Sequence, residues 1–149
     1  MSVVLGYDES PGALRALDVA IQTAAAFHEP LVLVYGAGAP GSLGEEYRAH
    51  SDALRSAGRE ALAHARSTAE AAGVPTVVEI LDAHPAQALL DAAARHAARV
   101  VVVGSYGESP MRGALLGSTP HKLLHLSSVP VLCVPAADPP VAVPPPGSP

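Results

Sequence analysis

Residues 100–107 read VVVVGSYG, a run of four valines followed by a turn that contains two glycines. Consecutive β-branched residues favour a β-strand, and a strand without apolar–polar alternation is typical of one that is covered on both faces. Strands of this kind belong to parallel sheets that lie between two layers of helices. The stretch therefore predicts an α/β domain.

Further short apolar runs of the same kind occur along the chain. They are Ser2–Tyr7, Leu31–Tyr35, Thr76–Leu81 and Val129–Val134. Ala- and Leu-rich stretches of helical composition separate the runs, so the predicted order of elements is βαβαβαβαβ. This order predicts an open parallel sheet with right-handed crossovers. Pro130 has no N–H to donate, which predicts that the last strand lies at a sheet edge.

Capping residues mark the expected helix boundaries. Ser10, followed by a proline, predicts the start of a first helix that ends near Phe27. We expect Ser118 or Thr119 to cap the last helix. The three later helices are expected over about residues 43–72, 85–98 and 120–126.

Length and composition limit the functions that the chain can have. Its 149 residues suit one domain, expected over residues 1–135, and the Pro-rich residues 136–149 predict a disordered or polyproline-like tail. A formal net charge of −5 and an aromatic content of 3% argue against nucleic acid as a partner. Cys133 is a lone cysteine, and no leader or long apolar span is seen, which predicts a cytoplasmic protein with no membrane partner.

The glycines after the valine run form a pattern suited to phosphate binding. Gly104 and Gly107 follow the predicted strand, nine residues intervene, and Gly117 leads into Ser118 and Thr119. Gly104 would let a ligand approach the main chain, and Gly107 would permit a tight turn. Free N–H groups and hydroxyls at a helix N-terminus favour an anion such as a triphosphate. Any one of these glycines is better explained by a strand end or a helix start, but the combination predicts a phosphate site.

Asp8 is a second candidate site residue because it ends the first predicted strand. Open parallel sheets bind ligands outside the carboxyl ends of their strands, where the strand order reverses. If the first and fourth strands are neighbours, Asp8 faces the glycine loop, and its carboxylate would bind ribose hydroxyls or a metal ion on the phosphates. The alternative is an acid that stabilises a helix start by about 0.3–1 kcal/mol.

On these motifs, the sequence resembles the universal stress protein family over residues 2–135. The spacing of Gly104, Gly107, Gly117 and Ser118 matches the family's ATP-binding signature, and residues 127–135, SSVPVLCVP, resemble its terminal strand. The resemblance implies a five-stranded parallel sheet in the order 3-2-1-4-5 with helices on both faces, a fold similar to that of the adenine nucleotide alpha hydrolases. It also implies ATP, with Mg²⁺, as the ligand and a homodimer formed through Val129–Val134.

The resemblance further implies where each part of the nucleotide binds. The implied contacts are Asp8 beside the nucleotide, the main chain of Gly36 at the adenine, Val103, Gly104, Tyr106 and Gly107 along the ribose and phosphates, and Gly117, Ser118 and Thr119 on the phosphates. Arg112, inside the intervening loop, is a further candidate for a phosphate oxygen, with an exposed loop arginine as the equal alternative.

Three other patterns have competing interpretations. Residues 36–41 match the dinucleotide-binding fingerprint, but a proline interrupts them, and Asp82, the next strand-end acid, lies about twice as far away as the ~20 residues that the fingerprint requires. His121 and His125, four residues apart, form only part of a metal ligand set. Cys133 is more typical of a small core residue than of a nucleophile.

The sequence favours an ATP-binding regulatory or stress-response protein in which nucleotide orders residues 108–116 and alters a surface that a partner protein recognises. A weak ATPase at the same site is the second hypothesis. It requires a base that positions water, and Asp8, Glu9, Glu108 and His121 are not at a recognisable catalytic spacing. The third hypothesis is a dimeric interaction module that uses no nucleotide.

Overall fold

The computed structural model describes residues 1–38, 44–105 and 116–136. Within these ranges strands and helices alternate along the chain, as the apolar runs predicted. The elements are β1 (Ser2–Gly6), α1 (Pro11–Phe27), β2 (Leu31–Gly36), α2 (Glu45–Ala71), β3 (Thr76–Leu81), α3 (Pro85–Arg95), β4 (Ala98–Gly104), α4 (Ser118–Leu126) and β5 (Val131–Val134).

The strands form one parallel sheet in the order β3-β2-β1-β4-β5. This order confirms the predicted fold class, and it leaves β5 at an edge, as Pro130 indicated. Pro130 itself precedes β5 and uses its carbonyl instead, which accepts a hydrogen bond of 2.9 Å from the Val101 N–H. The central strand β1 is buried from Ser2 to Leu5, which explains why the run is apolar without alternation.

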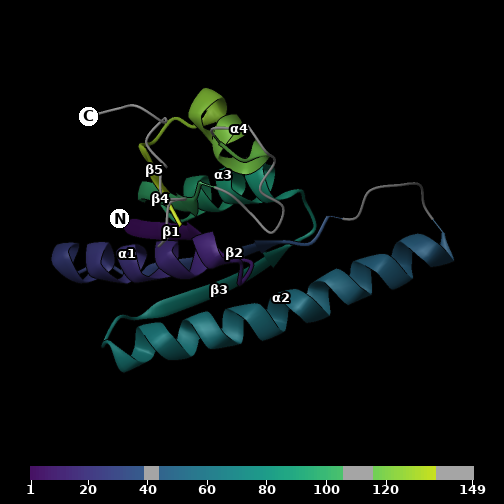
Figure 1. Cartoon of the computed structure of the whole chain (residues 1–149), viewed down its shortest axis with the longest axis horizontal. Coiled ribbons are helices and arrows are strands. Elements are labelled where there is room, and N and C mark those ends of the chain that lie inside the picture. The colour runs from purple at the N-terminus through teal and green to yellow at the C-terminus, as the bar shows by residue number, and fades with distance from the viewer. Residues whose placement is uncertain (39–43, 106–115, 137–149) are drawn as a thin grey trace, which may run out of the picture.

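Two helical layers cover the sheet, with α1 and α2 on one face and α3 and α4 on the other (Figure 1). Each face has its own core, because alternate strand residues point to opposite sides: Val3 and Leu5 pack under α1 and α2, and Val4 packs under α3. Gly58 lets α2 lie close to the sheet, since a Cβ there would stand 2.6 Å from the Tyr35 ring.

The long helix α2 extends beyond the sheet. Its 27 residues correspond to about 40 Å, about twice the length of the six-residue strand β3 that it covers. Its buried positions begin at Ser51, and residues 45–50 are exposed or half-exposed. In Figure 1 this first part of α2 projects past the strands.

Helix α1 has the predicted boundaries. The Ser10 side chain accepts a hydrogen bond of 3.3 Å from the Ala13 N–H, and Pro11 occupies the first turn. At the other end, His28 adopts a left-handed conformation with φ of 54°, and its N–H bonds the carbonyls of Ala24 and Ala25.

Several expected boundaries were wrong at the level of a few residues. Helix α3 ends at Arg95 and not near residue 98, because Ala97 adopts a positive φ of 48° and Ala98 already pairs with Ser2 in the sheet. Strand β4 therefore begins two residues before the valine run, and the register between β1 and β4 shifts after this first pair.

The last helix also starts earlier than expected. It includes Ser118 and Thr119, and Gly117 is the N-cap residue, so that neither hydroxyl caps the helix. Strand β5 begins at Val131 and not at residue 129. The expected start of the second helix at residue 43 lies outside the described residues. Within them, α2 begins at Glu45, and Gly44 is its N-cap residue.

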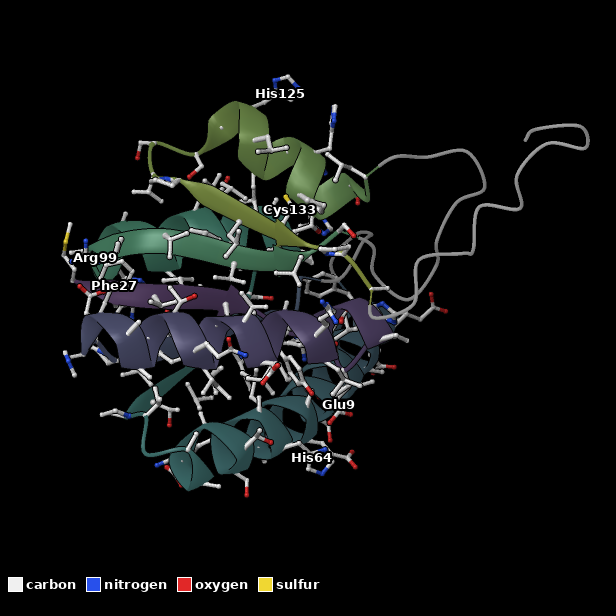
Figure 2. The ribbon with its side chains drawn as sticks, turned by 60° about the vertical axis from the view of Figure 1, so that its left-hand side comes forward. Glu9, Phe27, His64, Arg99, His125 and Cys133 are labelled. Carbon is white, nitrogen blue, oxygen red and sulfur yellow. The ribbon has the colours of Figure 1, made fainter. Side chains whose placement is uncertain are left out.

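An ion pair joins the amino-terminal ends of β2 and β4. Arg99 donates to Glu29 Oε1 from Nε at 2.9 Å and from Nη2 at 2.6 Å, and its guanidinium lies 4.3 Å from the centre of the Phe27 ring. Figure 2 shows Arg99 and Phe27 together at this end of the sheet. The hydrogen bonds from Arg99 hold the pKa of Glu29 below its ordinary value.

No helix among the described residues is both long enough and apolar enough to span a bilayer. The predicted Pro-rich tail covers residues 136–149. Only residue 136 belongs to the described part of the chain, and residues 137–149 lie outside it.

Candidate functional site

A cavity of about 560 Å³ lies at the carboxyl ends of β1, β2 and β4. The chain runs outward from β1 to β2 and β3 on one side and continues with β4 and β5 on the other, so the strand order reverses at this point. The lining residues are Gly6, Tyr7, Asp8, Ser10, Ala13, Val34, Tyr35, Gly36, Gly38, His50, Leu54, Pro85, Leu89, Val103, Gly104, Gly117, Ser118, Thr119 and Pro120. The volume lies within the ~300–1,000 Å³ that is usual for small-molecule sites.

The cavity brings together most of the residues that the sequence singled out. Asp8, Gly36, Val103, Gly104, Gly117, Ser118 and Thr119 all line it, although they come from four separate segments of the chain. The remaining candidates, Tyr106, Gly107 and Arg112, lie outside the described residues. The cavity supports a common site, and the individual contacts to a ligand stay predictions.

Asp8 lies at the cavity because β1 and β4 are neighbours, as the sequence argument required. Its Oδ1 accepts a hydrogen bond of 3.0 Å from the Ser10 N–H and so fixes the turn that leads into α1. Asp8 therefore also stabilises the start of α1, which was the alternative explanation for an acid at this position. Oδ2 has no hydrogen-bond partner within the described ranges and is free to meet a ligand.

The N-terminus of α4 provides a smaller phosphate cradle than the glycine pattern suggested. The Gly117 N–H donates to the Ser105 carbonyl at 2.7 Å, so this amide is already used. Gly117 has a φ of −67°, which any residue can adopt. Ser118 and Thr119 are the first helical residues, and the helix itself offers no acceptor for their N–H groups. Their amides, their hydroxyls and the helix dipole remain for an anion.

Gly104 has a packing role that the sequence argument did not foresee. A Cβ at this position would stand 2.7 Å from the carbonyl carbon of Gly12 and 2.9 Å from its oxygen. The strand end is therefore glycine because the first turn of α1 lies against it. The expectation that Gly104 lets a ligand approach the main chain stays a prediction, and the residue does line the cavity.

The glycines after β2 have the same explanation. A Cβ on Gly36 would meet the Ala83 carbonyl oxygen at 2.8 Å, and one on Gly38 would meet the Ala83 carbonyl carbon at 2.6 Å. The turn between β3 and α3 packs directly on them. This close packing, and a following helix that begins at Glu45 after the N-cap Gly44, disfavour the dinucleotide fingerprint as the reason for these glycines.

Sequence reasoning missed the part of the cavity wall that comes from the α1 and α2 face of the sheet. Tyr7 was read only as the end of an apolar run, yet its place directly before Asp8 was an available signal. Burial, together with the nearby carboxylates of Glu9 and Asp8, raises the pKa of the Tyr7 phenol above its ordinary value. His50 and Leu54 line the cavity because α2 extends beyond the strands, and no sequence pattern indicated this.

A side-chain contact ties the β1–α1 turn to α2. Glu9 has a positive φ of 63°, and its Oε1 contacts Nδ1 of His64. Figure 2 shows these two side chains pointing toward each other across the gap between α1 and α2. The contact holds the turn that carries Asp8 against the helix that carries His50 and Leu54.

Three other side chains considered in the sequence, His121, His125 and Cys133, do not line the cavity. His121 and His125 meet edge to face with ring centres 4.8 Å apart, and no third His, Cys, Asp or Glu joins them in the described part of the chain. Figure 2 shows His125 projecting outward from α4. Cys133 on β5 is half-buried, and burial raises the pKa of its thiol.

The fold and the cavity together define a doubly wound parallel α/β protein with a cavity at its topological switch point. The model of the Universal stress protein family matches residues 1–135. The chain therefore belongs to the universal stress protein family.

Individual relatives agree with this assignment. Universal stress protein MJ0531 of Methanocaldococcus jannaschii is 29% identical over 140 residues, which cover 89% of this chain and 80% of the relative. A universal stress protein structure from Archaeoglobus fulgidus has 25% identity and a TM-score of 0.71, and covers 90% of this chain and 98% of its own. A universal stress protein solved in complex with cAMP has 29% identity and a TM-score of 0.69, with coverages of 92% and 98%.

Proposed function

We propose that this chain is a nucleotide-binding regulatory protein that holds ATP, together with Mg²⁺, in the cavity at the switch point. The observation that carries the proposal is that Asp8, the end of β4 and the N-terminus of α4 line one cavity. These are the segments in which the sequence placed a carboxylate, a glycine turn and a helix start. The complex of a related universal stress protein with cAMP supports an adenine nucleotide as the ligand class.

In this proposal the phosphates bind at α4. The N–H groups and hydroxyls of Ser118 and Thr119 donate to phosphate oxygens, and the dipole of α4 adds to the attraction. The free Oδ2 of Asp8 holds either the ribose or the Mg²⁺ on the phosphates. Val103 and Gly104 lie beside the ribose, and the main chain of Gly36 faces the base.

The role that we propose is binding and regulation. The occupied and empty states would differ in the surface around the cavity, and a partner protein would recognise that difference. A second copy of the chain is proposed at β5, because this strand ends the described sheet and Leu132 on it is 39% exposed.

Isothermal titration with ATP and Mg²⁺ tests the proposed binding. A Ser118→Glu variant places a negative charge where the phosphates are proposed to bind, and a glutamate at this position is compatible with the helix start. We expect its affinity for ATP to fall at least about tenfold, which corresponds to about 1.4 kcal/mol. Ser128→Glu makes the same change of charge on an exposed residue outside the cavity and should bind like the unmodified chain.

The titration also separates the proposal from its alternatives. No binding of ATP at millimolar concentration would overturn it and would favour an interaction module that uses no nucleotide. Chromatography of the nucleotide after prolonged incubation distinguishes a binder, which returns ATP intact, from a slow ATPase, which releases ADP.

A further inference from the structure

The side chain of Tyr7 is enclosed almost completely and still belongs to the cavity wall. The residue follows β1 directly and is 4% exposed. Val3, Leu5 and Tyr7 alternate along the chain and share one core cluster, so the Tyr7 ring packs on the face of the sheet that α1 and α2 cover. Tyr7 also lines the cavity at the carboxyl ends of the strands.

The hydroxyl of Tyr7 has no hydrogen-bond partner within residues 1–38, 44–105 and 116–136. Some side-chain atoms among the described residues are fully buried and lack a hydrogen-bond partner, but the Tyr7 hydroxyl oxygen is not one of these fully buried atoms. The hydroxyl oxygen therefore keeps contact with solvent, and the cavity is the open space beside this otherwise buried residue. Water can satisfy this hydroxyl while the cavity is empty, and a polar group of a ligand that enters the cavity can take the place of that water.

A neutral phenol can both donate and accept a hydrogen bond. A phenol at its ordinary pKa of ~10 is protonated at neutral pH, and burial first, then the nearby Glu9 and Asp8 carboxylates, raise the pKa of Tyr7 further. The hydroxyl therefore suits a neutral polar group that carries donors and acceptors side by side. Phosphate oxygens only accept hydrogen bonds, and the free backbone amides at the N-terminus of α4 are better donors for them.

The two ends of the cavity lie on opposite faces of the sheet. Helix α4 packs on β4 and β5 together with α3, whereas Tyr7 lies on the face covered by α1 and α2. A nucleotide with its phosphates at Ser118 and Thr119 would extend across the ends of β4 and β1 and bring its base toward Tyr7 and Leu54. Leu54 offers an apolar surface for the flat face of the base.

We propose that Tyr7 is a specificity-determining residue whose hydroxyl hydrogen-bonds the base of the bound nucleotide. The inference rests on the proposed function, because it assigns one part of the same ligand. It goes beyond that function in predicting that recognition of the base, and not of the phosphates, depends on this phenol.

The test compares ATP with inorganic tripolyphosphate, which has the phosphates but no base. Both are titrated calorimetrically into the unmodified chain, Tyr7→Phe and Tyr47→Phe. We expect Tyr7→Phe to weaken ATP binding about three- to tenfold, the effect of one neutral hydrogen bond, and to leave tripolyphosphate unchanged. Tyr47→Phe removes a phenol from α2 outside the cavity and should alter neither affinity.

Each alternative result has a distinct meaning. Unchanged ATP affinity in Tyr7→Phe would overturn the inference and leave the proposed function standing. An equal loss for ATP and tripolyphosphate would overturn it as well, because the hydroxyl would then act through the turn that carries Asp8. Failure of the unmodified chain to bind ATP would overturn both proposals.

A measurement on the unmodified chain keeps the inference testable if Tyr7→Phe does not fold. Tyrosine labelled with ¹³C at Cζ gives one signal for each of the four phenols, and the Tyr7 signal is assigned as the one that Tyr35→Phe, Tyr47→Phe and Tyr106→Phe all retain. We expect ATP to shift this signal and tripolyphosphate to leave it in place. No shift with saturating ATP would overturn the inference.

Discussion

Replacing Gly104 by alanine separates two explanations for the first glycine of the motif. The added Cβ would stand 2.7 Å and 2.9 Å from the carbonyl carbon and oxygen of Gly12, and 3.1 Å from the Ala13 nitrogen. All three are backbone atoms in the first turn of α1, so no side-chain rotation relieves the overlap. The helix start would have to move away from β4.

The size of the effect follows from this geometry. Overpacking of a close-packed interior typically costs about 1–3 kcal/mol. In a chain of 149 residues each kcal/mol lowers the melting temperature by about 2–4 °C. We therefore expect Gly104→Ala without ligand to melt about 2–12 °C lower than the unmodified chain.

Urea unfolding followed by far-ultraviolet circular dichroism measures this loss directly. Gly6→Ala is the matched control, because it lies on the neighbouring strand and also lines the cavity. Its Cβ would first meet the end of the Leu89 side chain, which can rotate, so the loss of stability should be smaller. If Gly104→Ala kept full stability without ligand but lost affinity for nucleotide, the packing explanation would be refuted.

Three further predictions concern single interactions outside the proposed ligand contacts. Ser10→Ala should lower the free energy of unfolding in urea by about 0.5–2 kcal/mol through loss of the α1 cap, and an unchanged midpoint would contradict the capping role. Because the pKa of Glu29 is lowered, its bond with Arg99 stabilises the fold above the ordinary pKa of ~4.3, and this stabilisation is lost as the pH falls through the lowered value. The difference in free energy of unfolding between the unmodified chain and Glu29→Gln should therefore shrink below pH ~4. A difference that stays constant with pH would disprove this. Cys133 should react with iodoacetamide at neutral pH more slowly than a free thiol does, since burial raises its pKa, and equal rates would show that the thiol is not shielded.

The fold was predictable from the sequence because each strand is a short run of β-branched residues and each crossover has helical composition. The five runs at residues 2–7, 31–35, 76–81, 100–103 and 129–134 all became strands. The boundaries were less predictable. Local propensity does not show that Ala97 leaves the helix to let Ala98 pair with Ser2, or that Gly117 rather than a hydroxyl residue caps α4.

The candidate site was predictable where its residues lie at strand ends or at the start of α4. Asp8 and Gly104 follow from the rule that parallel sheets bind ligands at their carboxyl edge. The reason for Gly104 depends on how closely α1 approaches β4, which is a three-dimensional property. His50 and Leu54 reach the cavity because α2 extends beyond the sheet, and a helix length alone does not predict where its surplus turns lie.

The first turns of α2, which extend beyond the sheet, would show by their rate of hydrogen exchange whether the cavity holds a ligand. Amides near Leu62 lie in a packed core and should exchange with deuterium slowly, whereas those in the turns before Ser51 lack such packing and should exchange fast. A ligand held against His50 and Leu54 would retard only the fast end of this gradient. Deuterium uptake along one helix would then distinguish filled from empty molecules, with the slow end as an internal reference.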